Sequence, residues 1–284
     1  MTTAAVLSLL AALMFGAGTA LQAHAAYDVR PHAVVHLASL ARMTSRPLWL
    51  AGTALDLLGA LTHIAALHFG PLTLVQPLTL SAVVFAAPAQ FLFRRRRPTW
   101  GQVAAAVETA AGLALVSVFL GRDLRTGHAT ATTYAGGLAV ALLAVGGSVL
   151  VARQSHSRRT QALLLGTAAG SAYGLSDALA RTVQVQAATR LGSPGWLLEV
   201  ALALVVGGVG LLLTQAALQR DRLTSSLPAQ DLFALVVGIG MGAALLGEVP
   251  LLSVPVVIGT AAALALVVHG TRVLSAPPAP ALSW

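Results

Sequence analysis

Apolar stretches of about twenty residues, separated by short connections that carry arginine, dominate this chain. A helix that crosses the hydrocarbon core of a bilayer needs about 20 predominantly apolar residues. Only 9% of the residues are charged, whereas a soluble domain carries about 25%. Such a chain cannot cover its surface with charge, so the sequence predicts an integral membrane protein. Because lipid offers no hydrogen-bond partner to an open strand edge, the spanning segments must be helices.

Nine segments fit this length. We therefore expect an all-α, polytopic membrane protein of nine or ten transmembrane helices, with one transmembrane domain over residues 1–272 and a short proline-rich cytoplasmic tail over residues 273–284. The segments are 3–26, 47–69, 71–93, 99–120, 133–152, 160–184, 196–218, 224–247 and 250–270.

The first segment has a second interpretation. Its end, "AHAA" at Ala23–Ala26, resembles a signal-peptidase site after an apolar core. No positive charge precedes the apolar run, and the run is longer than the core of a signal peptide. We expect a retained helix, with a cleaved signal as the alternative.

The arginines predict the orientation. Thirteen of the seventeen lie in the connections after the first, third, fifth and seventh segments and in the tail, and three lie in the alternate connections. Because arginine is enriched on the cytoplasmic side, the N-terminus is expected outside the cell membrane and the C-terminus in the cytoplasm. The block Arg94–Arg97 then anchors the third segment at anionic lipid. This topology accounts for the net charge of +8, so we expect no nucleic-acid partner.

An internal repeat relates the two halves, about residues 1–120 and 133–272. Gly59–Pro77 aligns with Gly210–Pro228, and eight of the nineteen positions are identical. By arginine counting the two copies run in opposite directions, which is typical of transporters with a site near the bilayer midplane. Pro77 and Pro228 each remove a backbone donor, so they are expected to gate or line a cavity, or else to be packing kinks.

Polar residues inside the predicted helices are the candidate site. A charged side chain at a helix centre costs about 2.5–3.5 kcal/mol and must face the protein interior, a partner or water. The candidates for binding a substrate or ion are Asp56, His63, Gln76, Glu108, Tyr173, Asp177, Arg181 and Gln215.

The spacing of the charged candidates suggests roles. Asp56 and His63 lie seven residues apart on one helix face, where they could bind a cation, relay a proton or form structural hydrogen bonds. Asp177 and Arg181 lie four apart and could neutralise each other, or Arg181 could meet an anionic substrate group. Glu108 has no basic residue at helical spacing, so any partner lies on another helix, and it is a candidate for coupling to a proton or cation.

The remaining polar residues are assigned more simply. Tyr173 could offer a hydroxyl to a cavity, and Gln76 and Gln215 could bind substrate or bridge helices. Asp231, Glu248 and His269 are expected at helix ends near the membrane surface. The spacing GxxxGxxxG within residues 166–174 indicates close helix packing.

Several functional classes are excluded by missing patterns. The chain has no lysine and therefore no Walker loop, and it has no HExxH or GxSxG motif. We expect neither an ATP-driven pump nor an enzyme, and no cofactor. The absence of cysteine excludes disulfides.

A resemblance adds to this interpretation. The stretch "WLAGTALDLLGALTHIAALHFGPLTLVQPL" (Trp49–Leu78) resembles the second and third helices of NIPA-type magnesium transporters, within the drug/metabolite transporter superfamily. "FGAGTALQ" (Phe15–Gln22) fits the first helix of the same pattern. "SLPAQDLFALVVGIGMGAALLGE" (Ser226–Glu248) is similar to the penultimate helix of EamA-like members.

The chain departs from the magnesium-transporting pattern at specific positions. The acidic residue of the second helix in that family falls on Ala60, with Asp56 one turn earlier, and the neighbouring asparagine falls on His63. The glutamate expected after the third helix is replaced by Arg94–Arg97. The resemblance therefore implies the transporter fold, and magnesium is kept as an alternative cargo with the metal unassigned.

Together these features predict a secondary transporter of a small solute that works by alternating access. Its cavity is expected between the repeats, lined by segments 47–69, 71–93, 160–184 and 224–247. The alternatives are a transporter of magnesium or another divalent cation, and a membrane scaffold or lipid-interacting protein that transports nothing. The partners expected are membrane lipid and a small-molecule or ion substrate, with a homodimer left open.

Overall fold

The computed structural model describes residues 2–26, 45–82, 84–86, 99–121, 124–126, 130–220, 223–251 and 253–275. The tail 276–284, the block Arg94–Arg97 and most of the first arginine-bearing connection lie outside the described residues. The helices are α1 (Thr2–Ala26), α3 (Pro47–Phe69), α4 (Leu72–Leu80), α6 (Trp100–Gly121), α7 (Ala131–Gln154), α8 (Arg158–Arg190), α9 (Pro194–Arg220), α10 (Leu223–Met241) and α11 (Val254–Ser275), with a π-helical turn η1 (Gly242–Leu246) and two strands, β1 (Leu124–Thr126) and β2 (Glu248–Pro250).

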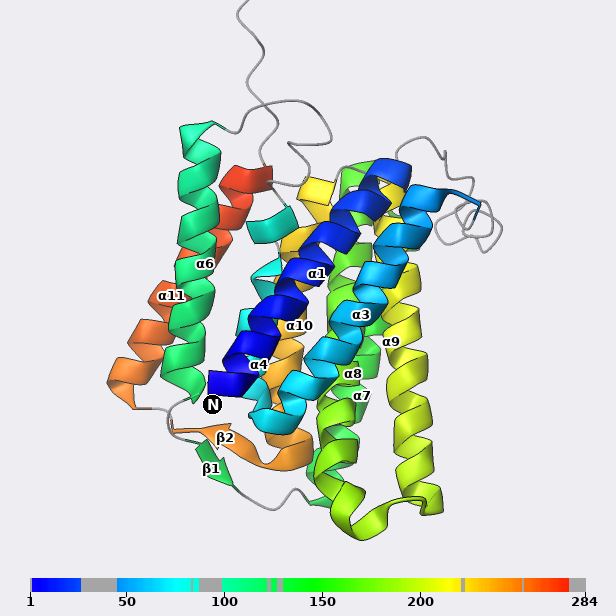
Figure 1. Cartoon of the computed structure of the whole chain (residues 1–284), viewed down its shortest axis with the longest axis vertical. Coiled ribbons are helices and arrows are strands. Elements are labelled where there is room, and N and C mark those ends of the chain that lie inside the picture. Colours follow the sequence, from blue (N-terminus) through cyan, green and yellow to red (C-terminus); the bar gives the residue numbers. More distant parts are fainter. Residues whose placement is uncertain are drawn as a thin grey trace, which may run out of the picture.

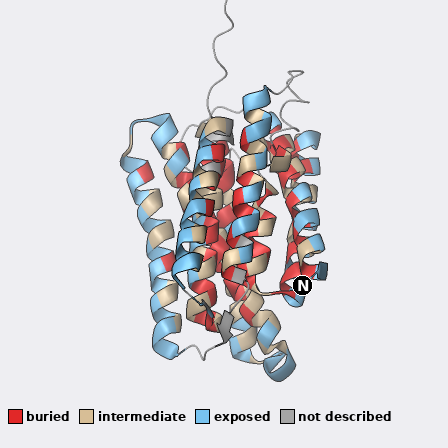
Figure 2. Ribbon diagram, turned by 90° about the vertical axis from the view of Figure 1, so that its left-hand side faces the viewer, coloured by how far each residue is buried: buried red, intermediate tan, exposed pale blue. Residues whose placement is uncertain are grey.

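The helices run side by side along the long axis of the molecule (Figure 1). α8 and α10 lie in the middle, and α6 and α11 form a peripheral pair (Figure 1). Buried residues concentrate between the helices, and exposed residues cover their outer faces (Figure 2). Many of the exposed side chains are large and apolar, among them Val140, Leu143, Leu198 and Leu204. Such outer faces contact lipid, as expected for a membrane protein.

Within the described residues, seven helices are long and apolar enough to cross a membrane by length and composition. They are Thr2–Ala25, Pro47–Phe69, Trp100–Leu120, Ala131–Gln154, Pro194–Arg220, Ala229–Leu246 and Val254–Val273. The chain is thus a helical, multi-pass membrane protein. Each of the nine predicted segments overlaps a described helix, but residues 87–93 of the third segment lie outside the described residues, α4 is short and α8 carries five charged residues. The count of nine spans and the orientation stay predictions.

Local sequence signals set several helix ends. Pro47 stands in the first turn of α3, where its missing N–H costs no helical hydrogen bond. Thr130 caps α7 by reciprocal hydrogen bonds with Thr133. Gly247 closes η1 at a φ of 66°, a left-handed conformation that glycine adopts without strain.

Small residues let α8 and α10 approach closely. A Cβ added to Gly174 would lie 2.7 Å from main-chain atoms of both Ala234 and Gly238. A Cβ added to Gly170 would overlap the carbonyl oxygen of Gln230. The GxxxGxxxG spacing therefore serves packing, as the sequence indicated.

A two-stranded antiparallel ladder was not expected from the sequence. β1 follows α6 and pairs with β2, which follows η1, in the register Leu124 with Pro250 and Thr126 with Glu248. The predicted segment 250–270 accordingly begins too early, because residues 248–250 are in β2 and α11 begins at Val254. Strands of three residues carry too little periodicity to be recognised in a sequence.

The aligned glycines of the predicted repeat have similar surroundings. A Cβ on Gly59 of α3 would lie 3.1 Å from the Phe15 ring of α1, and a Cβ on Gly210 of α9 would lie 2.9 Å from the Tyr173 ring of α8. In both cases an aromatic ring on the preceding partner helix covers the glycine. This correspondence is what an inverted repeat would produce, and the repeat itself stays a prediction.

Candidate functional site

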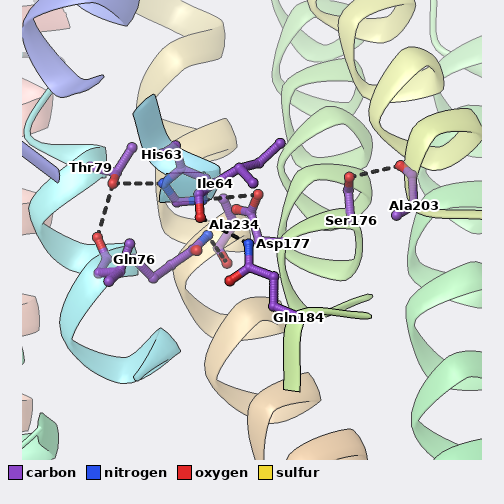
Figure 3. A network of polar contacts seen from close by, with 10 residues as sticks. His63, Ile64, Gln76, Thr79, Ser176, Asp177, Gln184, Ala203 and Ala234 are labelled. Atoms are coloured by element: carbon purple, nitrogen blue, oxygen red, sulfur yellow. Dashed lines mark hydrogen bonds and ion pairs between the residues drawn. The ribbon is translucent and has the colours of Figure 1, made fainter. Parts of the chain in front are cut away.

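His63 connects three helices in the bundle interior (Figure 3). Its side chain is buried on α3, with Nδ1 2.9 Å from Thr79 Oγ1 of α4 and Nε2 3.1 Å from Asp177 Oδ1 of α8. The Thr79 hydroxyl can donate to the Val75 carbonyl oxygen at 3.0 Å. In that arrangement Nδ1 donates to Thr79 and Nε2 faces the Asp177 carboxyl group. The His63 ring therefore links α3 to both α4 and α8.

Arg181 lies one helical turn after Asp177 and contacts a different part of the bundle. Its NH1 donates to the Leu67 carbonyl oxygen near the end of α3 at 2.6 Å, and its Nε lies 3.7 Å from Glu248 Oε1. The other carboxylate oxygen of Glu248 accepts the Leu72 N–H at the start of α4 at 3.2 Å. This pair joins α8, the α3–α4 corner and β2.

One of the two alternatives for Asp177 and Arg181 is wrong. These residues do not neutralise each other, because each turns to a partner on another element, His63 for Asp177 and Glu248 for Arg181. Glu248 lies just after a helix end, as expected, but it is packed inside the protein, since only 8% of it is exposed. The π-helical turn and the β ladder bring it back over the end of the bundle, where it meets the arginine.

The Glu248 carboxyl should make stability depend on pH. Burial raises the pKa of Glu248, and the attraction of Arg181 and the hydrogen bond from Leu72 only partly offset the rise. The folded protein therefore keeps this proton at pH values where the unfolded chain has lost it. The resulting stabilisation is complete below the ordinary glutamate pKa and is lost as the pH rises through the raised one.

We expect the thermal midpoint of the purified protein to fall as the pH rises through this window, and the Glu248→Gln variant to show a flatter profile. Thermal unfolding of both proteins in detergent over a pH series measures the difference. Parallel profiles would show that Glu248 has the same pKa in both states.

Gln76 and Pro77 lie in α4 and are buried. Gln76 Nε2 donates to the Ala234 carbonyl oxygen of α10 at 3.2 Å, so it bridges helices (Figure 3). Pro77 lines an apolar cavity of about 290 Å³ between α1, α4 and α6, together with Leu9, Phe85 and Leu113. Helix α4 ends three residues after the proline. Pro228 lies in α10.

Asp56 and Gln215 belong to a second polar cluster, at a different level of the bundle from His63. Trp49 Nε1 donates to Gln215 Oε1 at 3.2 Å, and Gln215 Nε2 donates to Gln22 Oε1. Gln22 Nε2 donates in turn to Asp56 Oδ2 at 2.7 Å and contacts Thr53 Oγ1 at 3.3 Å. Asp56 and His63 share a helix face, but they do not share a partner.

Two further candidates lie apart from these clusters. The Tyr173 hydroxyl of α8 is 3.4 Å from Thr214 Oγ1 of α9, which also contacts Gln230 Oε1 of α10 at 2.9 Å. Glu108 of α6 pairs with His269 of α11, with 2.9 Å between Oε2 and Nδ1. Its partner is indeed on another helix, yet the pair stands at the periphery, and the His269 side chain is 67% exposed.

The structure thus brings two of the predicted residues, His63 and Asp177, into contact. Gln76 lies three residues before Thr79 on α4, and Arg181 lies four residues after Asp177 on α8. Four residues of these clusters are not predicted as site residues from the sequence: Gln22, Trp49, Thr79 and Glu248. Gln22 lies inside an apolar run, and a polar residue in such a position indicates a side chain that needs a partner in the protein interior. Glu248 could have been found by asking which carboxylate balances an arginine inside a helix. Trp49 and Thr79 carry no such signal.

Comparison with known proteins leaves the family open. The chain is 26% identical over 250 residues to an uncharacterized protein of Corynebacterium glutamicum, which covers 86% of this chain and 85% of that protein. No family model matches the chain. No solved structure matches it.

Proposed function

We propose that this protein is a secondary transporter of the drug/metabolite type that moves a small solute across the cell membrane by alternating access. The observation that carries the proposal is that two pairs of ionisable side chains, His63–Asp177 and Arg181–Glu248, link α8 to α3 and to β2 within an apolar bundle. Charged groups inside membrane helices are costly and commonly mark paths for substrates or ions.

The irregular backbone beside these residues supports the proposal. α4 contains Pro77, ends at Leu80 and lines an apolar cavity, and α10 continues into the π-helical turn η1. Interrupted helices are common at the binding sites of secondary transporters. The matched surroundings of Gly59 and Gly210 add support for two inverted halves.

The His63–Asp177 and Arg181–Glu248 pairs suggest how access would alternate. Both pairs tie α8 to the other elements at the end of the bundle that carries the β ladder. With the pairs formed, this end is held together. Alternating access requires that they separate when the other end closes.

Flux into proteoliposomes that contain the purified protein tests the proposal. A magnesium-sensitive dye and a pH dye are followed first, and then the uptake of radiolabelled amino acids, sugars and organic cations. Uptake of an organic solute above empty liposomes is expected. Magnesium entry alone would favour the divalent-cation alternative, and no flux of any kind would favour a scaffold that transports nothing.

The Asp177→Asn variant should lose at least about tenfold in transport rate, because a hydrogen bond to a charged group contributes about 1.5–3 kcal/mol. Initial uptake rates in proteoliposomes with equal protein content measure the loss. Glu199→Gln is the matched control, since Glu199 contacts the Tyr134 hydroxyl between α9 and α7, away from the cluster. Equal rates in both variants would remove Asp177 from the transport path.

A further inference from the structure

The cluster around Asp56 is not part of the proposed transport site. Two glycines next to Asp56 leave room for its carboxyl group between α1 and α3. A Cβ on Gly18 of α1 would overlap Asp56 Oδ1 and lie 2.7 Å from the Gly52 carbonyl oxygen. A Cβ on Gly52 of α3 would lie 2.7 Å from the Gly18 carbonyl oxygen. The two glycines bring α1 and α3 into contact and leave room between them for the carboxyl group.

The two oxygens of the Asp56 carboxyl group differ in their hydrogen bonding. Oδ2 accepts from Gln22 Nε2, whereas Oδ1 is buried and has no hydrogen-bond partner among the described residues. Within the same part of the chain no basic group lies at ion-pair distance from Asp56. An ionised carboxylate buried without a cation costs far more than a neutral acid. The arrangement therefore suits a carboxylic acid whose proton sits at Oδ1.

Among the described residues, no ion pair joins Asp56 to a basic group on a neighbouring element. On α1 the single titratable group among the described residues is His24, which is exposed. On α8 the Tyr173 hydroxyl is 3.4 Å from Thr214 Oγ1, and Asp177 pairs with His63. Arg46, at the start of α3, donates to the Ala25 carbonyl oxygen of α1. The others are His63 and His68 on α3, Arg158, Arg159, Arg181 and Arg190 on α8, and Glu199 and Arg220 on α9; α4 has none.

We propose that Asp56 is a reversible proton-binding site and that the proton is the ion coupled to transport. This inference rests on the proposed transport function. The Asp56 carboxylate takes a proton from water on one side of the membrane and becomes a neutral acid, and it returns the proton to water on the other side when the α1–α3 contact opens.

The hydrogen-bond chain explains how this proton would reach the rest of the molecule. Trp49, Gln215 and Gln22 each donate to the next member, and the last donation is to Asp56. The Gln215–Gln22 link joins α9 to α1. An ionised Asp56 strengthens the last donation and a neutral one weakens it, so the proton alters the contact between the two halves of the bundle.

Infrared difference spectroscopy of the full chain in lipid nanodiscs, stepped from acid to alkaline pH, tests the site without a transport substrate. A carbonyl band of a protonated carboxylic acid should be lost at alkaline pH, and labelling with ¹³C-aspartate should shift it. The band should be absent in Asp56→Asn, an isosteric change that still accepts from Gln22. It should persist in Asp231→Asn, which removes a different aspartate from the bundle.

Three results would overturn the inference. The band could be unmoved by ¹³C-aspartate in the wild-type protein, a result that needs no variant to fold. It could persist in Asp56→Asn and vanish in Asp231→Asn. It could also be abolished by sodium at constant pH, which would make the site one for a metal cation.

Different results would contradict the proton site at Asp56 and the transport function. If the aspartate band is found and no solute moves in proteoliposomes, the proton site stands and transport does not. If solute moves and Asp56→Asn responds to a pH gradient as the wild type does, transport stands and the coupling by Asp56 is wrong.

Discussion

Replacing Gly170 by leucine is expected to prevent α8 from packing on α10, so that little protein folds. The first carbon of the new side chain would overlap the carbonyl oxygen of Gln230, which is a rigid main-chain atom. Adding a larger side chain to a packed interior costs about 1–3 kcal/mol. Here the loss is expected to be large, because the main-chain oxygen of Gln230 cannot rotate away as a side chain can. The expected loss is at or above the upper end of that range, together with a broad, aggregated profile in size-exclusion chromatography.

Gly146→Leu in α7 is the matched control. A Cβ at Gly146 meets nothing within 4 Å, so the same substitution there adds apolar surface without a clash. Its chromatographic profile and melting temperature should equal those of the wild type. Equal melting temperatures for the two variants would show that the close contact of α8 and α10 is not needed for the fold.

Removing Glu248 while keeping Arg181 is expected to destabilise the protein by roughly 3–5 kcal/mol, the range found when one partner of a buried ion pair is deleted. The Arg181 side chain is 19% exposed and that of Glu248 is 10% exposed, so little water reaches the stranded charge. Thermal unfolding of Glu248→Ala in detergent measures the loss. Arg190→Ala, which removes an exposed arginine that contacts Gln186, should change little.

The double variant Arg181→Leu, Glu248→Leu distinguishes two contributions to stability. One is the penalty for leaving Arg181 buried without its partner, and the other is the net contribution of the ion pair. Replacing both partners of a buried pair by apolar residues is often neutral or stabilising. We therefore expect the double variant to be more stable than Glu248→Ala. If the loss in the double variant equals the sum of the losses in Arg181→Leu and Glu248→Leu, then Arg181 and Glu248 act independently and the 3.7 Å contact has no energetic role.

Features that depend on local sequence could be predicted. The apolar runs gave the positions of the helices, because the length of a span is set by the bilayer. The glycines of residues 166–174 indicated that α8 packs closely. The intramembrane positions of His63, Asp177 and Arg181 marked them as candidates, since such residues need partners.

Features that depend on contacts between distant residues could not be predicted. The pairing of Asp177 with His63 rather than Arg181 follows from how α8 is turned against α3. The burial of Glu248 depends on the π-helical turn and on β2, neither of which has a sequence signature in five or three residues. The Gln22–Gln215 hydrogen bond joins residues 193 positions apart, and the periodicity of a helix relates only residues a few positions apart.

The β1–β2 ladder limits which motions are open to this end of the bundle. Its backbone hydrogen bonds tie the connection after α6 to the connection after η1, and Glu248 is itself a ladder residue paired with Thr126. A sliding of α10 past α6 would have to break that ladder. A pivot about the ladder would keep it intact while Arg181 and Glu248 part. The β1–β2 ladder would then be the hinge of the motion, and the helices would move furthest at their opposite end.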